Sequence, residues 1–309
     1  MSAEPLKEQL RRFYDVLRKP ALRRVIGGLV LVLSFGYLGY VLASNWSDLR
    51  AYEWRVDYSK AALAFIWYSV ALGFAVAGWT MMMGRLTSVT EPRKHLKYYV
   101  YTNLLKRLPG PLLDVFGRVY FYEREGLAGS LIVTISLLEW GVLILSGIGI
   151  YVLTLAFIPT LTGWGSPFIM FALLVVGVVL IRPKTLRSIL RFVGKEDQLV
   201  SFGYRDLVLW LVIYGLVWTV GGLVLFAGIN SLYTLSVRHL PAVVGIWVAS
   251  GLISTLVRIT PVGLGLKELT LSVLLGHLVP TPLAIVIALL MRVGITLFEI
   301  IWGIVVMNL

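Results

Sequence analysis

The sequence predicts an all-α polytopic membrane protein. Hydrophobic residues make up 58% of its 309 positions and charged residues only 14%, whereas soluble domains are about 25% charged. Mean hydropathy is +0.86, and several apolar runs approach the roughly 20 residues that a helix needs to cross a bilayer. We expect about six full transmembrane helices and two broken, re-entrant helical hairpins, together forming an inverted repeat.

Residues 1–24 predict a basic amphipathic helix lying on the membrane surface. A solvated tail that only sets topology is the alternative. The single transmembrane domain, 25–309, then begins with a retained span at 25–43, because a cleaved signal peptide would have a shorter apolar region. Apolar residues recur at helical spacing between the lysines and arginines of the first segment: Leu6, Leu10, Phe13 and Leu17.

Five further full spans and two interrupted segments follow. In the segment 98–127, Pro109, Gly110 and Pro111 separate two apolar runs, each too short to cross the membrane. We interpret it as a re-entrant hairpin, with a surface-lying pair of helices as the alternative. A second broken hairpin covers 243–278. The full spans are expected at 61–83, 131–157, 167–181, 207–228 and 283–307.

The distribution of lysine and arginine predicts the orientation. Cytoplasmic loops carry an excess of these residues, so we expect a multi-pass protein of the plasma (inner) membrane with both termini in the cytoplasm. The segments assigned to the cytoplasm, 1–24, 84–97 and 182–205, hold 7, 4 and 6 of them, against 3, 0 and 1 in the outer segments 44–60, 158–166 and 229–241.

Composition also excludes several classes of protein. There is no cysteine, which removes thiolate chemistry and disulfides. The three histidines are far apart, and no nucleotide-binding motif is present, so we expect no metal, no cofactor and no intrinsic ATPase. The net charge of +12 is explained by topology and anionic lipid headgroups, and we expect no nucleic-acid partner.

An internal repeat relates the two broken segments. LLKRLPG, at 104–110, and LVRITPV, at 256–262, each place a basic residue shortly before a proline. Three crossings separate them, so the second copy enters from the opposite side of the membrane. We expect repeat halves of about 61–157 and 207–307, with a site at their interface near the midplane.

The charges of the two copies are exchanged. Arg118 and Glu139 lie 9 and 30 residues after the first proline, whereas Glu268 and Arg292 lie 7 and 31 residues after the second. Arg292 is nine residues into the last span, or roughly 14 Å deep, and needs an anionic partner. Glu268 or Glu139 is the candidate, because Glu299 is too far along the same helix.

Two interpretations of these charges remain open. Arg292–Glu268 and Arg118–Glu139 pairs would simply hold the broken helices against the long ones. Alternatively, a headgroup phosphate competes for the arginines, loosens the pairs and lets one repeat move against the other. The candidate substrate-binding residues are Arg118, Glu139, Arg258, Pro261, Gly263, Gly265, Glu268 and Arg292.

Backbone and interfacial groups add to this candidate site. A half-helix beginning after Gly263 and Gly265 would direct free N–H groups into the membrane interior, where they bind an anion. Equally, Glu268 in its first turn would neutralise that helix end. Lys106 and Arg107 either gather headgroups or simply sit at the interface.

Two motifs resemble the transmembrane region of the lysylphosphatidylglycerol synthase/flippase family. They are NLLKRLPGPLLDVFGRVYFYEREG at 103–126 and the Pro, Gly-Leu-Gly, Glu and Arg pattern within 260–292. The resemblance implies a helical membrane domain that moves a lipid between leaflets. Because the chain ends two residues after the last span, we expect no aminoacyl-transferase domain. The residues 112–114 depart from the family pattern, where more glycine is expected.

The expected function is lipid translocation of a phospholipid or a lipid-linked anionic headgroup, and an enzyme is not expected. Two rival functions stay open: an accessory membrane protein that presents lipid to a partner enzyme, and an integral membrane transferase that uses a polyprenyl-phosphate substrate. The expected partners are membrane lipids, together with a second copy of the chain or a partner lipid-modifying enzyme.

Overall fold

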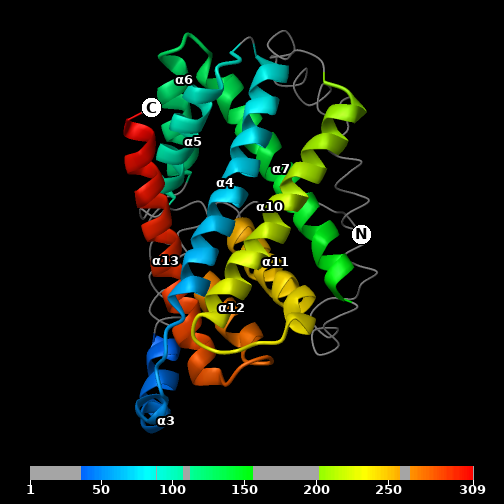
Figure 1. Ribbon diagram of the computed structural model, residues 1–309. Coiled ribbons are helices and arrows are strands. Elements are labelled where there is room, and N and C mark those ends of the chain that lie inside the picture. Colours follow the sequence, from blue (N-terminus) through cyan, green and yellow to red (C-terminus); the bar gives the residue numbers. More distant parts are fainter. Residues whose placement is uncertain (1–35, 88, 107–111, 156–201, 258–264, 309) are drawn as a thin grey trace, which may run out of the picture.

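The computed structural model describes residues 36–87, 89–106, 112–155, 202–257 and 265–308. The predicted surface helix 1–24 and the predicted span 167–181 lie outside these ranges, as do Arg107, Arg258, Pro261 and Gly263. All regular structure within the described ranges is helical, which confirms the all-α class (Figure 1). Its elements are α3 (Trp46–Ala51), α4 (Tyr58–Leu86), α5 (Pro92–Leu105), α6 (Leu113–Glu123), α7 (Gly129–Thr154), α10 (Tyr204–Asn230), η4 (Val237–His239), α11 (Leu240–Val257), α12 (Leu266–Leu275) and α13 (Thr281–Met307).

Among the described residues, five helical stretches are long and apolar enough to cross a membrane. Four of them, α4, α7, α10 and α13, correspond to predicted full spans. The fifth, Val237–Thr255, contains most of α11, which the sequence analysis treated as the entering arm of a broken hairpin. α11 begins three residues earlier than expected, at Leu240. The protein is therefore a polytopic α-helical membrane protein.

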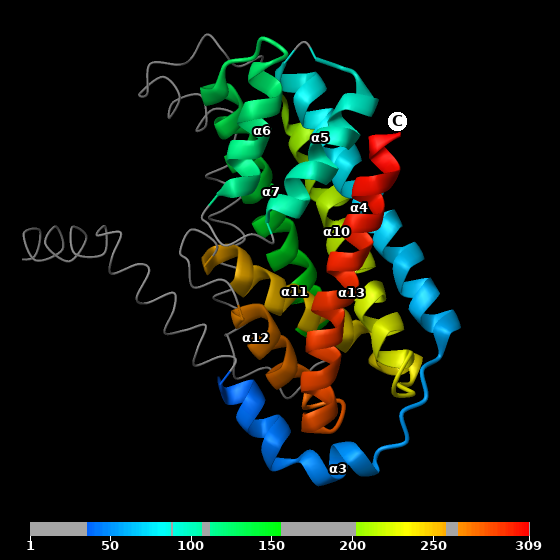
Figure 2. The ribbon, with the colours of Figure 1, turned by 90° about the vertical axis from the view of Figure 1, so that its left-hand side faces the viewer.

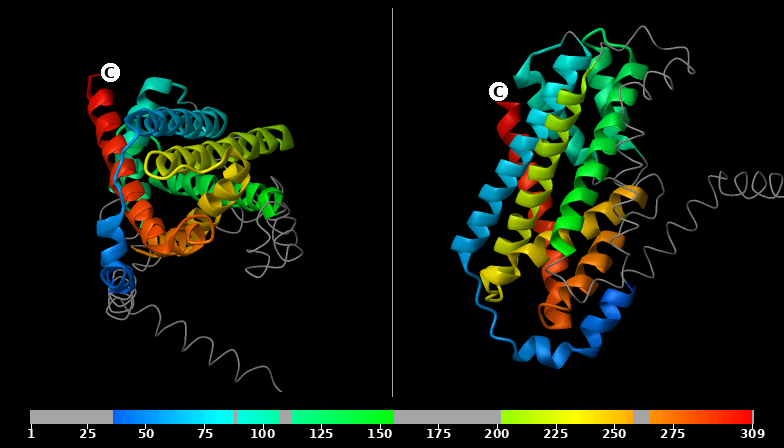
Figure 3. Two further views of the ribbon diagram at one scale, coloured as in Figure 1. Left: turned by 60° about the horizontal axis from the view of Figure 1, so that its bottom comes forward. Right: turned by 90° about the vertical axis from the view of Figure 1, so that its right-hand side faces the viewer.

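The helices form one elongated bundle with α10 near its centre. α10 packs against α4, α7 and α11, and α13 packs against both α12 and α5. Figures 1 and 2 show α5 and α6 side by side at the end of the bundle where the chain finishes. α12 lies in the opposite half, and the chain after it reaches the other end before α13 begins (Figure 3).

Two glycines set the local geometry. Gly265 precedes α12 with φ +90°, a left-handed conformation that side chains disfavour and glycine adopts readily. It therefore allows a sharp entry into a new helix. On α10, a Cβ placed on Gly222 would lie 2.7 Å from the Cα of Val244. The absence of a side chain there lets α11 approach α10 closely, a common mode of helix packing in membranes.

The surface of the bundle matches a lipid environment. Along α13 a row of large apolar side chains is exposed, while the opposite face is buried against α12 and α5. In water such a row would be an aggregation hazard, but lipid tails solvate it without cost. The exposed residues of this row are Leu290, Val293, Leu297, Ile300, Ile301 and Ile304.

Candidate functional site

Arg118 and Glu139 form an ion pair between α6 and α7, which we call the enclosed pair. Arg118 donates from Nη1 to Oε2 of Glu139, and the two residues are only 1% and 3% exposed. The pairing predicted from the sequence is thus present. At this burial each charge depends on the other, because an isolated ion in a dry interior is strongly unfavourable.

Three further helices complete the environment of the enclosed pair. Tyr214 of α10 donates to Oε1 of Glu139 at 2.7 Å, and Tyr99 of α5 donates to the same oxygen at 3.2 Å. The Arg118 guanidinium lies 4.0 Å from the ring centroid of Trp79 on α4. Both carboxylate oxygens therefore have donors, and the cation has an aromatic face.

The guanidinium itself retains unused donors. Nε and Nη2 of Arg118 are buried and have no hydrogen-bond partner. Buried donors without partners are rare, and each one in a native structure calls for an explanation. Two neighbouring N–H groups in one plane suit a phosphate or carboxylate, which agrees with the candidate role of Arg118.

Lys106 and Asp114 lie where α5 ends and α6 begins. The Nζ of Lys106 is 3.9 Å from a carboxylate oxygen of Asp114 and 5.6 Å from the ring centroid of Tyr99. Asp114 is 2% exposed and stands one turn before Arg118. Lys106, predicted to gather headgroups, thus directs its amine toward the interior, and Asp114 is a buried charge that the sequence analysis did not single out.

A second polar network connects α4, α5 and α6 near the end of the bundle. The indole N–H of Trp79 donates to the hydroxyl oxygen of Tyr122 at 2.8 Å, and that hydroxyl lies 2.6 Å from Nδ1 of His95. The other ring nitrogen of His95 is 3.2 Å from the carbonyl oxygen of Val89. The carbonyl oxygen can only accept, so the imidazole N–H is on Nε2, and the Tyr122 hydroxyl donates a hydrogen bond to the unprotonated Nδ1 of a neutral ring. Burial lowers the pKa of His95 below its ordinary value.

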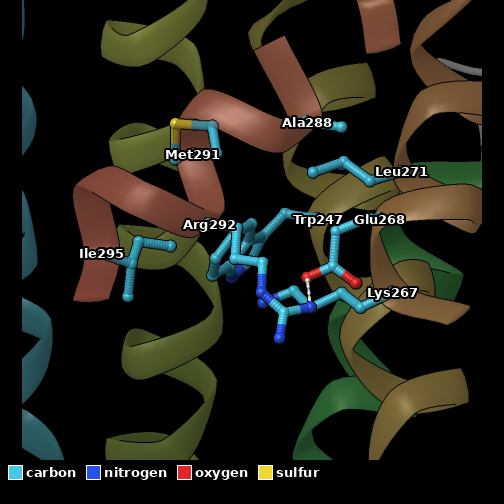
Figure 4. Close-up of a pocket in the computed structure, with 8 residues that line it drawn as sticks. All are labelled: Trp247, Lys267, Glu268, Leu271, Ala288, Met291, Arg292 and Ile295. Atoms are coloured by element: carbon cyan, nitrogen blue, oxygen red, sulfur yellow. Dashed lines mark ion pairs between the residues drawn. The ribbon is translucent and has the colours of Figure 1, made fainter. Parts of the chain in front are cut away.

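Glu268 of α12 and Arg292 of α13 form the second interhelical pair, which we call the pocket pair. Oε1 of Glu268 is 2.9 Å from Nη1 of Arg292, as the sequence analysis predicted. The Glu268 side chain is 8% exposed and the Arg292 side chain 29%, so this pair is more accessible than the enclosed pair. It lines a pocket between α11, α12 and α13 (Figure 4) formed by Trp247, Lys267, Glu268, Leu271, Ala288, Met291, Arg292 and Ile295.

The pocket combines both signs of charge with an aromatic wall. The Nζ of Lys267 lies 4.0 Å from the ring centroid of Trp247. Oε2 of Glu268 is buried and has no hydrogen-bond partner, and Oε1 forms the ion pair with Arg292. Glu268 lies in the first turn of α12, after Gly265, and Oε2 does not bond to the N–H groups of that turn. Arg292, Lys267 and the N-terminal end of α12 are the kinds of group that bind anions in proteins.

The structure brings six of the predicted residues into place. Arg118 and Glu139 make the enclosed pair, Glu268 and Arg292 the pocket pair, Gly265 starts α12, and Lys106 ends α5. The other four, Arg107, Arg258, Pro261 and Gly263, lie outside the described residues. In the ranges that the structure covers, no group of three or more metal-ligating side chains occurs.

Comparison with known families does not assign this chain. No protein-family model matches its sequence, and no curated protein matches it significantly.

Proposed function

We propose that this chain is a lipid translocase that moves an anionic phospholipid, or a lipid-linked anionic headgroup, between leaflets without an ATPase of its own. The observation that carries the proposal is the existence of two Arg–Glu pairs with exchanged charges. In the enclosed pair the short helix α6 supplies the arginine and the long helix α7 the glutamate. In the pocket pair α12 supplies the glutamate and α13 the arginine.

The depths of the two pairs support a site near the membrane midplane. Glu139 is 139 − 129 = 10 residues from the start of α7, and Arg292 is 292 − 281 = 11 residues from the start of α13. At 1.5 Å per residue both lie about 15–17 Å from a helix end. Half of a hydrocarbon core of about 30 Å is a similar distance. Ionisable groups at such depth usually mark a substrate or ion path.

An inverted repeat would explain the arrangement. The units α5–α6–α7 and α11–α12–α13 each consist of two helices followed by a long helix that carries the partner charge. The arms α5 and α6 lie at one end of the bundle, and α12 lies in the other half (Figure 2). In transporters built from inverted repeats, one repeat moves against the other around a central site.

The difference between the two pairs fits such a cycle. The enclosed pair is buried, while the pocket pair borders a pocket and has a partly exposed arginine. In our proposal the headgroup phosphate enters at Arg292, competes with Glu268, and later meets the unused donors of Arg118. We also propose that both termini lie on the cytoplasmic side of the plasma (inner) membrane.

Leaflet exchange of fluorescent lipids in reconstituted vesicles tests the proposal. We expect the wild type to move anionic lipid, and Arg292→Ala, which lacks the group that receives the headgroup, to lose most of this activity. Arg55→Ala and Glu53→Ala are matched controls, because they break an Arg–Glu pair whose side chains are 88% and 80% exposed. If the wild type moves no lipid of any class, the proposal is wrong.

A charge exchange separates a binding role from a scaffold role. The double variant Glu268→Arg with Arg292→Glu retains an ion pair but reverses its direction. If the pair only holds α12 against α13, stability and transport both recover. If Arg292 receives the headgroup, stability recovers and transport does not. Recovery of full transport would therefore exclude the pocket pair as the binding site.

A further inference from the structure

The two carboxylates differ in how completely their oxygens are satisfied. Glu139 accepts from Arg118 on one oxygen and from two tyrosine hydroxyls on the other. Oε1 of Glu268 forms an ion pair with Arg292 at 2.9 Å, and its Oε2 is buried with no hydrogen-bond partner. An ionised carboxylate accepts several hydrogen bonds, and a buried acceptor without a donor is unfavourable. Both oxygens of Glu139 therefore have hydrogen-bond donors, whereas Oε2 of Glu268 has none.

Within the part of the chain that the structure describes, few charged groups face Glu268. α13 contributes Arg292, and the neighbouring residue of α12 contributes Lys267. α11 contributes the ring of Trp247 and has no charged or titratable side chain between Leu240 and Val257. Arg258 follows α11 and lies outside the described residues. Among the residues that line the pocket, Glu268 is thus the sole acid.

We propose that Glu268 is a proton-binding site whose occupancy frees Arg292 to bind an anionic headgroup. A proton from the aqueous phase adds to Oε2, which becomes a hydroxyl, and the carboxyl group becomes neutral. The Arg292 guanidinium and the Lys267 ammonium keep their charges. The formal charge of these three side chains therefore rises by one, which favours a phosphate in place of the former carboxylate partner.

Proton and headgroup binding are then linked. A ligand that binds the protonated site more tightly must also increase the affinity for the proton by the same factor. A proton gradient could thereby supply the energy for directed lipid movement in a chain without a nucleotide-binding motif. This coupling rests on the proposed function, but protonation of Glu268 does not.

Infrared difference spectroscopy tests the protonation without requiring any lipid movement. Purified wild-type protein in detergent is taken from alkaline to acidic pH, and the carbonyl stretch of a protonated carboxylic acid is followed. We expect a band that is missing in Glu268→Gln and present in Glu139→Gln. Tyr214→Phe provides a second variant at the enclosed pair should Glu139→Gln fail to fold. An identical band in wild type and Glu268→Gln would overturn the proposal.

The coupling is tested by exchange of fluorescent phosphatidylglycerol in phosphatidylcholine vesicles at a series of pH values. We expect the wild-type rate to rise on acidification, by at most about tenfold per pH unit for one linked proton. Glu268→Gln mimics the protonated acid and should be fast at every pH. His95→Gln should keep the wild-type dependence, because its imidazole lies outside the pocket.

The outcomes separate the two proposals. If the wild type moves no lipid but the infrared band depends on Glu268, the translocase proposal fails and the proton site stands. If lipid moves and its pH dependence is unchanged in Glu268→Gln, the proton site fails and the translocase proposal stands.

Discussion

Tyr214 of α10 donates a 2.7 Å hydrogen bond to the same Glu139 carboxylate that accepts from Arg118 of α6. The central helix of the bundle is thereby connected to a short broken-segment helix through one carboxylate on α7. Movement of α6 relative to α10 must break or remake this connection. The enclosed pair therefore links α10 to the α5–α6 unit. In addition, its two buried charges neutralise each other.

Removing the Tyr214 hydroxyl should destabilise the protein more than removing the hydroxyl of Tyr99. Hydrogen bonds to charged groups contribute about 1.5–3 kcal/mol, and the Tyr214 bond is the shorter of the two, at 2.7 Å against 3.2 Å. We expect Tyr214→Phe to lower the free energy of unfolding by about 2 kcal/mol and Tyr99→Phe by less. Thermal unfolding in detergent measures both. Equal losses of unfolding free energy in the two variants would show that both tyrosine hydroxyls stabilise the Glu139 carboxylate equally.

Replacing only one residue of the enclosed pair should strongly destabilise the protein. Arg118→Met leaves Glu139 as an uncompensated buried charge, and such changes cost about 3–5 kcal/mol. Arg118→Met with Glu139→Gln should recover part of that loss, because no net charge remains buried. Arg292→Met is the matched change at the pocket pair and should cost less, since its side chain is 29% exposed. A larger loss at Arg292 than at Arg118 would contradict this ranking.

The sequence predicted both ion pairs because charges in apolar segments are costly enough to require partners. For Arg292, the spacing excluded Glu299 and left Glu268 and Glu139 as candidate partners. The tyrosine donors could not be identified in the same way, since Tyr99 and Tyr214 resemble ordinary aromatic residues of apolar helices until the helices are assembled. The broken segments were recognisable from Pro109 and Pro261, yet no property of the sequence indicated which pair would be enclosed.

Other features depended on tertiary geometry. His95 stood out in the sequence only as one histidine among three, but the structure buries it completely against Tyr122. The unused oxygen of Glu268 depends on where Lys267 directs its amine, which is toward the ring of Trp247. Such rotamer choices follow from packing between α11 and α12, and periodicity does not encode them.

Close packing of α10 and α11 should not tolerate a side chain at Gly222. An added Cβ would lie 2.7 Å from the Cα of Val244, a backbone atom that cannot move aside cheaply. We expect Gly222→Ala to cost about 1–3 kcal/mol. Gly73→Ala on α4 is the control, because an added Cβ there meets no atom within 4 Å, and alanine should stabilise this helix by about 0.5–1 kcal/mol. Equal effects of the two substitutions on thermal unfolding would exclude a packing role for Gly222.

Acidification should destabilise the protein through His95. This residue lies in the first turn of α5, outside the five candidate spans, and burial lowers its pKa. Below its unfolded pKa of about 6.5 the unfolded chain binds a proton that the folded imidazole resists, so stability is complete above that pH and is lost as the pH falls. Unfolding temperatures measured from neutral to mildly acidic pH should fall in the wild type and stay flatter in His95→Gln. If the unfolding temperature of His95→Gln depends on pH as steeply as that of the wild type, another group causes the loss of stability.

The two ends of the bundle should be accessible from opposite sides of the membrane. Arg124 follows α6 at one end, and Arg238 lies in η4, between α10 and α11, at the other; both are exposed. Because the chain has no cysteine, single variants Arg124→Cys and Arg238→Cys report without background. With the proposed orientation, a membrane-impermeant maleimide should label Arg238→Cys in intact cells and Arg124→Cys only after permeabilisation. Labelling of both variants in intact cells would contradict an inverted arrangement. If Arg124→Cys is labelled in intact cells and Arg238→Cys only after permeabilisation, the two ends still lie on opposite sides, but the orientation in the membrane is opposite to the proposed one.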